Sequence, residues 1–392
     1  MSTALRPLLG ALLCCLVATG AEAQSLLSAR GLGMPFLPTD GRAVALGGVG
    51  VGLIGAELSV VDPAAPARLL VPSVAFSFQS SWADYDDNGS TGDFSGTRFP
   101  YIALGYPSSF GTVSLSLGGY LDQRWTSDQS KLIDLDGAGG TGRVTDNFRS
   151  DGGISTVRLG LARSLTPNVD VGIQVGRHIG DVSRVFTRTF DSLDVGGVVQ
   201  PYQSGGRWSY RGWLASVGAS ADVGSILRIA GAWTWAGDLE ALPDEDTLGG
   251  EAVFPLPSEL RVGATAVLSP RLRASVGVHQ SGWSSVDDAL EGEGARDTFA
   301  WGGGLEWAGA SVLGKSSRLR LGYRNTPLPF TWEGVDDPAE SVFSGGLGMD
   351  LLVVQGVVLS RLDLALERGT RTGGTFEESF WRLATSVRLS GF

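Results

Sequence analysis

The stretch RLRLGYR at residues 318–324 places arginine or glycine at every even position and leucine or tyrosine at every odd one. The same period of two residues appears in VRLGLA at residues 157–162 and in RLDLALE at residues 361–367. Successive side chains of a β-strand point to opposite faces, so each stretch predicts a strand with one apolar face. Such a strand fits a soluble sheet as well as a membrane barrel, and the spacing of the strands must decide.

The rest of the chain contains enough strands of this kind for a barrel. We expect fourteen strands, an even number, at about residues 73–82, 98–106, 111–122, 154–165, 168–187, 207–220, 226–236, 258–268, 271–283, 297–308, 316–325, 342–353, 357–368 and 380–391. The connections between them alternate in length, and the short ones include residues 107–110, 166–167, 222–224 and 269–270. This alternation puts the long loops on one side of a membrane and the tight turns with both termini on the other, as in outer-membrane barrels.

The start of the chain predicts export. Arg6 is followed by a short apolar run at residues 8–17 and by the Ala-Glu-Ala sequence of residues 21–23, which together form a signal peptide with its cleavage site. We therefore predict a signal peptide at residues 1–23. Both cysteines, Cys14 and Cys15, lie inside it, so the mature chain has no thiol for a disulfide, a metal site or a nucleophile.

The composition narrows the class of protein further. The 392 residues include 58 Gly, 11 Trp and only two His, and the formal net charge is −11. A barrel explains a near-average hydrophobicity, because half of each strand faces lipid and half faces water. The acidic balance excludes nucleic-acid binding by the usual basic surface. We predict a location in the bacterial cell outer membrane, in contact with its lipid.

Residues 24–72 do not belong to the predicted wall. They are rich in small residues, contain Pro63 and Pro66, and show no alternation long enough to span a membrane. Their apolar content argues against a disordered tail, which is the other interpretation. We predict an all-β protein: a 14-stranded antiparallel transmembrane β-barrel (residues 73–392) with residues 24–72 as an N-terminal hatch or plug segment in the lumen.

These features resemble the FadL-type family of outer-membrane transporters for hydrophobic compounds. In that family the hatch has an Arg-Ala start, a glycine-rich run and an Asn-Pro-Ala sequence, and residues 42–43, 46–50 and 62–64 take those places here, with Asp62 instead of asparagine. Residues 319–324, 345–348 and 362–367 are similar to its C-terminal quarter. The resemblance implies fourteen strands, a hatch, and transport of hydrophobic or amphipathic small molecules such as long-chain fatty acids.

The same pattern is shared by PorV/PorQ-like barrels of type IX secretion systems. This leaves an alternative function open, namely a binding or scaffolding barrel whose partners are secretion-system proteins. Co-purification with such partners would favour scaffolding, whereas lipid held in an apolar lumen pocket would favour transport.

Two groups of residues are candidates for the functional site. The movable part of a hatch is expected at flexible or turn-forming positions, namely Gly47, Gly48, Gly50, Gly52, Asp62 and Pro63. The lumen-facing phase of the strands carries arginines that could hold an anionic group bidentately, namely Arg158, Arg228, Arg261, Arg273, Arg318, Arg320 and Arg361. The alternative interpretation is that these arginines pair with lumen carboxylates.

We expect neither a catalytic site nor a cofactor. The sequence has no G-x-S-x-G or HExxH stretch, and His178 and His279 have no metal-ligand partner at a suitable spacing. Residues 84–89 imitate the opening of an EF-hand loop, but the twelfth position is Ser95 where a bidentate glutamate is needed. An ordinary acidic loop is the better interpretation, and no metal site is predicted.

Overall fold

The computed structural model describes residues 25–37, 39–87, 89–135, 140–191, 200–247, 249–290, 294–331 and 338–391. The predicted signal peptide at residues 1–23 lies outside the described residues. In the described part of the chain, no helix is long and apolar enough to cross a membrane.

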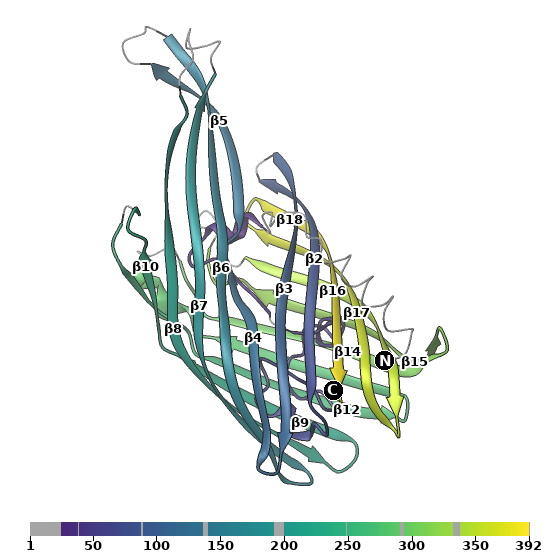
Figure 1. The fold of residues 1–392 in the computed structure, drawn as a ribbon. Helices are drawn as coiled ribbons and strands as arrows, with labels where there is room; N and C mark the ends of the chain where they lie inside the picture. Colours follow the sequence, from purple (N-terminus) through teal and green to yellow (C-terminus); the bar gives the residue numbers. More distant parts are fainter. Residues whose placement is uncertain are drawn as a thin grey trace.

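The described chain forms one closed antiparallel sheet (Figure 1). Its strands are β2 (Ser73–Asp87), β3 (Ser90–Ser108), β4 (Gly111–Asp122), β5 (Trp125–Leu135), β6 (Gly140–Thr166), β7 (Val169–Phe190), β8 (Tyr202–Val223), β9 (Leu227–Ala236), β10 (Asp238–Pro243), β11 (Ala252–Pro255), β12 (Glu259–Ser269), β13 (Leu272–Ser281), β14 (Thr298–Val312), β15 (Lys315–Pro327), β16 (Ala339–Val354), β17 (Val357–Gly373) and β18 (Phe376–Ser390). Pairing of β18 with β2 closes the barrel. Because β5 continues β4, β10 continues β9 and β11 leads into β12, the wall has fourteen strands, and the predicted fold class is confirmed.

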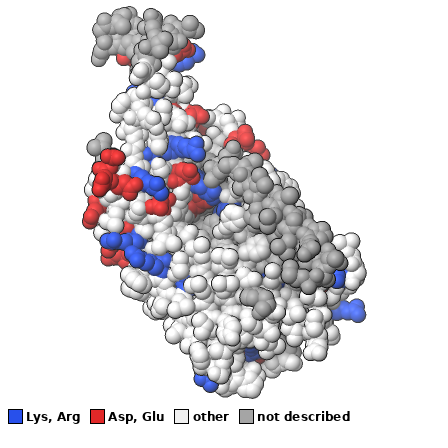
Figure 2. Space-filling view, in the orientation of Figure 1, with Lys and Arg blue, Asp and Glu red and all other residues white. Residues whose placement is uncertain are grey.

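The wall alternates between an apolar outer face and a polar or small inner face. On β7, Ile173 and Val175 are each 55% exposed, whereas Gln174 between them is 3% exposed and faces the lumen. The visible lower face of the molecule is almost free of charged side chains, which gather nearer the upper end (Figure 2). Such an outer surface suits contact with lipid, where exposed charges are costly.

One part of the wall is much taller than the rest. Strand β6 has 27 residues and β7 and β8 have 22 each, whereas a strand crosses a bilayer in about 9 to 11 residues. Together with β5, their upper halves form a four-stranded sheet that rises above the remaining strands (Figure 1). We call this sheet the tower.

Residues 25–72, here called the N-terminal segment, carry four short elements: η1 (Leu26–Ala29), β1 (Met34–Pro35), α2 (Gly41–Ala45) and η2 (Ala65–Arg68). Helix α2 begins at Asp40, whose Oδ1 accepts a hydrogen bond from the Ala43 nitrogen at 2.7 Å. It ends at Ala45, and the positive φ angles of Gly47 and Gly48 just beyond it let the Gly48 nitrogen donate to the Ala43 oxygen. Helix α2 packs on β15, β16, β17 and β18.

Glycines on the inner face of the wall leave room for this segment. A Cβ atom at Gly322 would overlap the Gly47 nitrogen, and one at Gly172 would overlap the Pro63 oxygen. The backbone of the segment can therefore approach the backbone of the wall, which larger side chains would prevent.

The wall has one seam where neighbouring strands do not pair. Pairing of β3 with β4 ends at Tyr101, so among the strands residues 90–98 of β3 pair with β2 alone, and the Thr97 oxygen accepts from the Arg124 side chain at 2.9 Å. Strand β1 pairs with Leu121 and Asp122 at the free edge of β4, and the Phe36 nitrogen donates to the Tyr120 oxygen. The N-terminal segment thus provides hydrogen-bond partners for backbone groups of β4 that β3 does not pair with. Backbone groups that face lipid or are buried need such partners because no water reaches them.

Adjacent glycines of β16 test this packing. A Cβ at Gly346 would overlap Ala45 of α2 and lie 2.8 Å from the Leu364 oxygen, whereas at Gly345 the nearest atom would be 3.8 Å away. We expect Gly346→Val to destabilise the protein by about 1–3 kcal/mol, the usual cost of overpacking, and Gly345→Val to change it little. Heat-dependent mobility on denaturing gels and protease cleavage within residues 25–72 measure both effects. Equal behaviour of the two variants would contradict the packing described here.

Candidate binding cavity in the lumen

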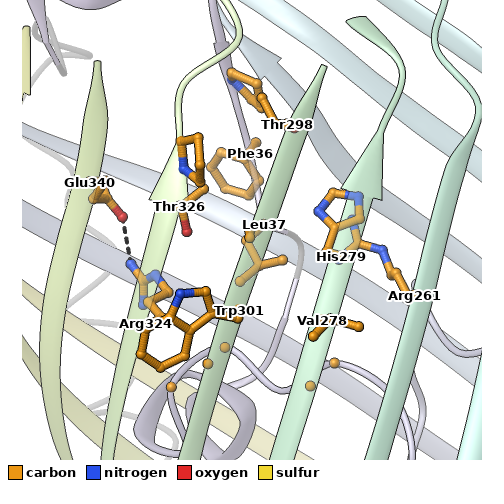
Figure 3. Close-up of a pocket in the computed structure, with 18 of the residues that line it drawn as sticks. Phe36, Leu37, Arg261, Val278, His279, Thr298, Trp301, Arg324, Thr326 and Glu340 are labelled. Carbon is orange, nitrogen blue, oxygen red and sulfur yellow. Dashed lines mark hydrogen bonds and ion pairs between the residues drawn. The ribbon is translucent and has the colours of Figure 1, made fainter. Parts of the chain in front are cut away.

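A cavity of about 130 Å³ lies between the N-terminal segment and the wall (Figure 3). Phe36 and Leu37 of the segment line it, and the wall strands border it at Val278 of β13 and Trp301 of β14, whose side chains are 37% and 48% exposed on the outer face. The cavity also reaches Trp283 of η3 (Trp283–Leu290), next to the apolar cluster near the barrel mouth. Much of its lining is therefore apolar, as expected of a small-molecule site.

A second part of the lining is strongly cationic. Arg324 donates to Glu340 at 2.7 Å, as Figure 3 shows, and Arg371 donates to the other oxygen of Glu340 at 2.7 Å. Arg382 donates to Glu367 at 2.9 Å. These three arginines line the cavity but are already paired with carboxylates, which offsets the cost of burying them.

Arg98 differs from these neighbours. Its Nε donates to the Gln79 Oε1 atom at 2.8 Å, and its guanidinium lies 4.1 Å from the centre of the Phe36 ring. Within the described residues, Arg98 forms no ion pair with a carboxylate. A cation that is held by an amide and a ring keeps the capacity to bind an anion.

A histidine and an arginine form a third polar contact at the cavity. Glu259 accepts from Arg261 at 3.0 Å and lies 3.2 Å from the His279 Nε2 atom. Arg261 and His279 both line the cavity. Because the Glu259 carboxylate contacts both side chains, the positive charge on this side of the cavity is better neutralised than the charge of Arg98.

Ion pairs anchor the N-terminal segment below the cavity. Arg42 bonds to Glu306 of β14 at 3.1 Å and to Glu57 of the segment at 2.7 Å. Glu57 also lies near Arg361 and Arg388 of the wall. Burial alone would raise the pKa of Glu57, but Arg388, Arg42 and Arg361 hold it below its usual value.

A second anchor lies at η2. Arg68 bonds to Asp170 of β7 at 2.8 Å and to Asp222 of β8 at 2.6 Å. Arg228 of β9 bonds to the same two carboxylates, at 2.7 and 3.0 Å. The segment is therefore held to the wall by charge at two separate places.

The predicted hatch residues lie in the segment beside the wall or the cavity. Gly47, Gly48 and Gly50 line the cavity. Gly52 lies against Gly263 of β12, and its nitrogen donates to Asp62 at 3.3 Å. Pro63 lies against Gly172 and Gly218. Their role in gating stays a prediction.

The seven predicted arginines are mostly engaged in ion pairs. Their nearest carboxylate partners are Asp170 for Arg228, Glu259 for Arg261, Glu306 for Arg273, Asp363 for Arg320, and Asp350 for Arg318 and Arg361. Arg158 bonds instead to the Val60 oxygen at 3.1 Å and to Thr156. Among these seven, only Arg261 lines the cavity. The arrangement favours the interpretation that these arginines stabilise the filled lumen.

Arg98 escaped the sequence analysis for a physical reason. Ser77 of β2 pairs with Tyr101, but Gln79 pairs with Arg98, so β3 carries one extra residue at Phe99 and Pro100. This bulge reverses the phase of the strand and turns Arg98 inward, whereas strict alternation from Tyr101 would turn it toward lipid. The proline within the strand was the one available signal of a bulge.

Comparison with known protein families identifies the family of this chain. A sequence model of the BamG family matches residues 7–204, just over half of the chain. The chain belongs to the BamG family. No curated protein matches its sequence.

Several solved structures have the same fold as this BamG-family barrel. One is the toluene transporter TbuX of Ralstonia pickettii, which is 17% identical to this chain with a TM-score of 0.59. The match covers 90% of this chain and 98% of TbuX. A FadL homologue of Pseudomonas aeruginosa has 13% identity and a TM-score of 0.60, covering 90% and 98%. The toluene transporter TodX of P. putida has 13% identity and a TM-score of 0.56, covering 93% and 98%. The expected FadL-type fold is confirmed, and the BamG-family barrel is an outer-membrane protein. Secretion-system partners find no support in these comparisons.

The docking of α2 in this BamG-family barrel should depend on pH. Burial, assisted by the nearby Glu57 and Asp363, raises the pKa of Asp40 from 3.8 to about 6. A carboxyl group whose pKa is higher in the folded state stabilises that state at low pH, and this contribution is lost as pH rises through about 6. We expect the midpoint of thermal unfolding to fall between about pH 4 and 6 by a few degrees more in the wild type than in Asp40→Asn, which keeps an oxygen for the Ala43 nitrogen. Parallel pH profiles would contradict the prediction.

Proposed function

We propose that this protein admits small hydrophobic or amphipathic molecules across the outer membrane, with the lumen cavity as their binding site. The observation that carries the proposal is the lining, in which the Phe36 ring and other apolar groups lie beside the Arg98 cation, which has no carboxylate partner among the described residues. Transfer of an apolar solute from water to such a lining lowers its free energy. The cation favours solutes that also carry an anionic group.

The size of the cavity favours a small solute. A dry apolar cavity of roughly 150 Å³ binds one benzene molecule, and the cavity here is about 130 Å³. A single ring or a short chain therefore fits with little rearrangement. A long-chain fatty acid requires displacement of the N-terminal segment, and two of the structural relatives are described as toluene transporters.

The proposal assigns the N-terminal segment the role of a hatch. Residues 34–37 lie between the cavity and the seam, and Phe36 packs against Gly119 of β4. Displacement of β1 from β4 opens a path from the cavity sideways through the seam, whereas release of Arg68 opens one toward the turn side. The glycines at 47, 48, 50 and 52 supply the backbone freedom for either movement.

A disulfide lock tests the hatch. Pro35 of β1 and Leu121 of β4 face each other in register, and both native cysteines lie in the predicted signal peptide. We expect oxidised Pro35→Cys/Leu121→Cys protein to take up a radiolabelled monoaromatic probe about tenfold more slowly than the same protein after reduction. The matched control joins two wall strands through Ala103→Cys/Ser116→Cys, which are also in register, and should be insensitive to oxidation. If the oxidised protein takes up the probe as fast as the same protein after reduction, β1 does not move during uptake. If cells with the wild-type protein take up the probe no faster than cells without it, the protein does not transport the probe.

A substitution at Arg98 tests the cationic part of the site. Loss of one charge-assisted hydrogen bond costs about 1.5–3 kcal/mol, so Arg98→Gln should bind octanoate about 10- to 100-fold more weakly and toluene about equally well. Arg368→Gln serves as control, because Arg368 is exposed beside Trp381 on the outer face. Titration calorimetry of the purified protein in detergent measures both ligands. Equal loss of octanoate and toluene binding would show that Arg98 has only a structural role.

A further inference from the structure

The tower presents two chemically different faces. On its inner face, the Phe148 and Phe186 rings lie 4.8 Å apart and Tyr202 lies 6.2 Å from Phe186, so aromatic rings run across β6, β7 and β8. The outer face of the same strands carries polar residues such as Asn147, Thr187 and Arg207. Tyr202 is 58% exposed and the Phe148 and Phe186 rings are only partly buried, so the aromatic stripe is not the core of a packed layer in the described part of the chain.

The inner face is also hollowed and cationic. A recess of about 290 Å³ is lined by Trp125, Phe148, Arg184, Phe186, Gly206 and Trp208 among others. Arg184 lies 6.0 Å from the Trp208 ring and donates to Gln123 at 3.1 Å, without a carboxylate partner in the described residues. Arg188 and Lys131 share the single carboxylate of Asp146. Among the described residues of this face, positive charge therefore exceeds negative charge, although the whole chain is acidic.

We propose that the inner face of the tower is a binding site for an acidic oligosaccharide. The C–H face of a sugar ring packs flat on aromatic side chains, while its hydroxyl groups need polar neighbours, which Ser127 and Ser204 provide on the same face. Carboxylate or phosphate groups of the sugar bind Arg184, whose planar guanidinium favours such anions. A purely hydrophobic solute has no use for that cation.

This site is separate from the lumen cavity, because no residue lines both. The tower stands on the long-loop side of the barrel (Figure 1), and charged side chains gather at its foot (Figure 2). A bound acidic sugar chain would lie beside the mouth of the barrel. Sugar binding can therefore fail or succeed independently of transport.

Calorimetric titration of the purified full barrel with a mannuronate hexamer tests the proposal, and maltohexaose is the neutral counterpart. We expect saturable binding of the acidic hexamer that weakens with added salt, and much weaker binding of maltohexaose. Arg184→Ala and Phe186→Ser should each reduce affinity at least about tenfold. Arg207→Ala, which removes an arginine from the outer face of the same sheet, should leave affinity within about twofold.

Three results would overturn the inference. Absence of saturable binding would exclude the site, and equal affinity for both hexamers would exclude the role of charge. Displacement of the acidic hexamer by toluene would show that the recess collects hydrophobic solutes instead. Heat-dependent gel mobility verifies that each variant remains a folded barrel, and Phe186→Leu provides a second variant of smaller structural effect.

Discussion

The structure depends on the pairing of backbone hydrogen-bonding groups in a sheet that has no ends. Lipid offers no partner to an exposed N–H or C=O group, so a spanning strand must find its partners on both sides. Strand β18 meets this need for β2 along the full length of both strands. At the seam beside β3, the backbone of β4 finds its partners in the N-terminal segment instead of a wall strand. There β1 and Phe36 bond to β4 where β3 does not. The wall therefore relies on a segment from its own lumen for part of its backbone pairing.

Charge organises the interior that closure creates. Arg42, Glu57 and Glu306 tie the segment to the wall, and Arg320 joins Glu306 to Asp363 with an exposed fraction of 2%. Each buried ion is costly alone, and removal of one partner leaves the other unpaired in a poorly hydrated lumen. Such networks stabilise one position of the segment. Arg98 stands outside them, with an amide and an aromatic ring as its partners, and the preference proposed for the cavity rests on this exception.

The sequence predicted the wall well because lipid on one side and a filled lumen on the other impose a strict period of two residues. Even the turns at residues 107–110 and 269–270 could be placed. The height of the tower was missed, since above the membrane both faces of a strand meet water and the alternation weakens. The cavity was missed for another reason. A bulge at Phe99 and Pro100 reverses the phase of one strand, and no local pattern shows that Phe36 lies beneath Arg98. The arginines chosen from phase alone proved to be mostly the paired ones.

The long reach of the N-terminal segment affects the order in which the molecule can be assembled. The Ser25 hydroxyl donates to Glu378, 353 residues away, and α2 packs on β15 to β18. The first residues of the described chain therefore cannot dock until its last strands are in place. Contacts between such distant residues form slowly, because a very long loop must close before they stabilise anything. Docking of the segment is thus a late step of folding, and a barrel whose wall has closed but whose lumen is still empty is a natural intermediate on the way to the structure described here.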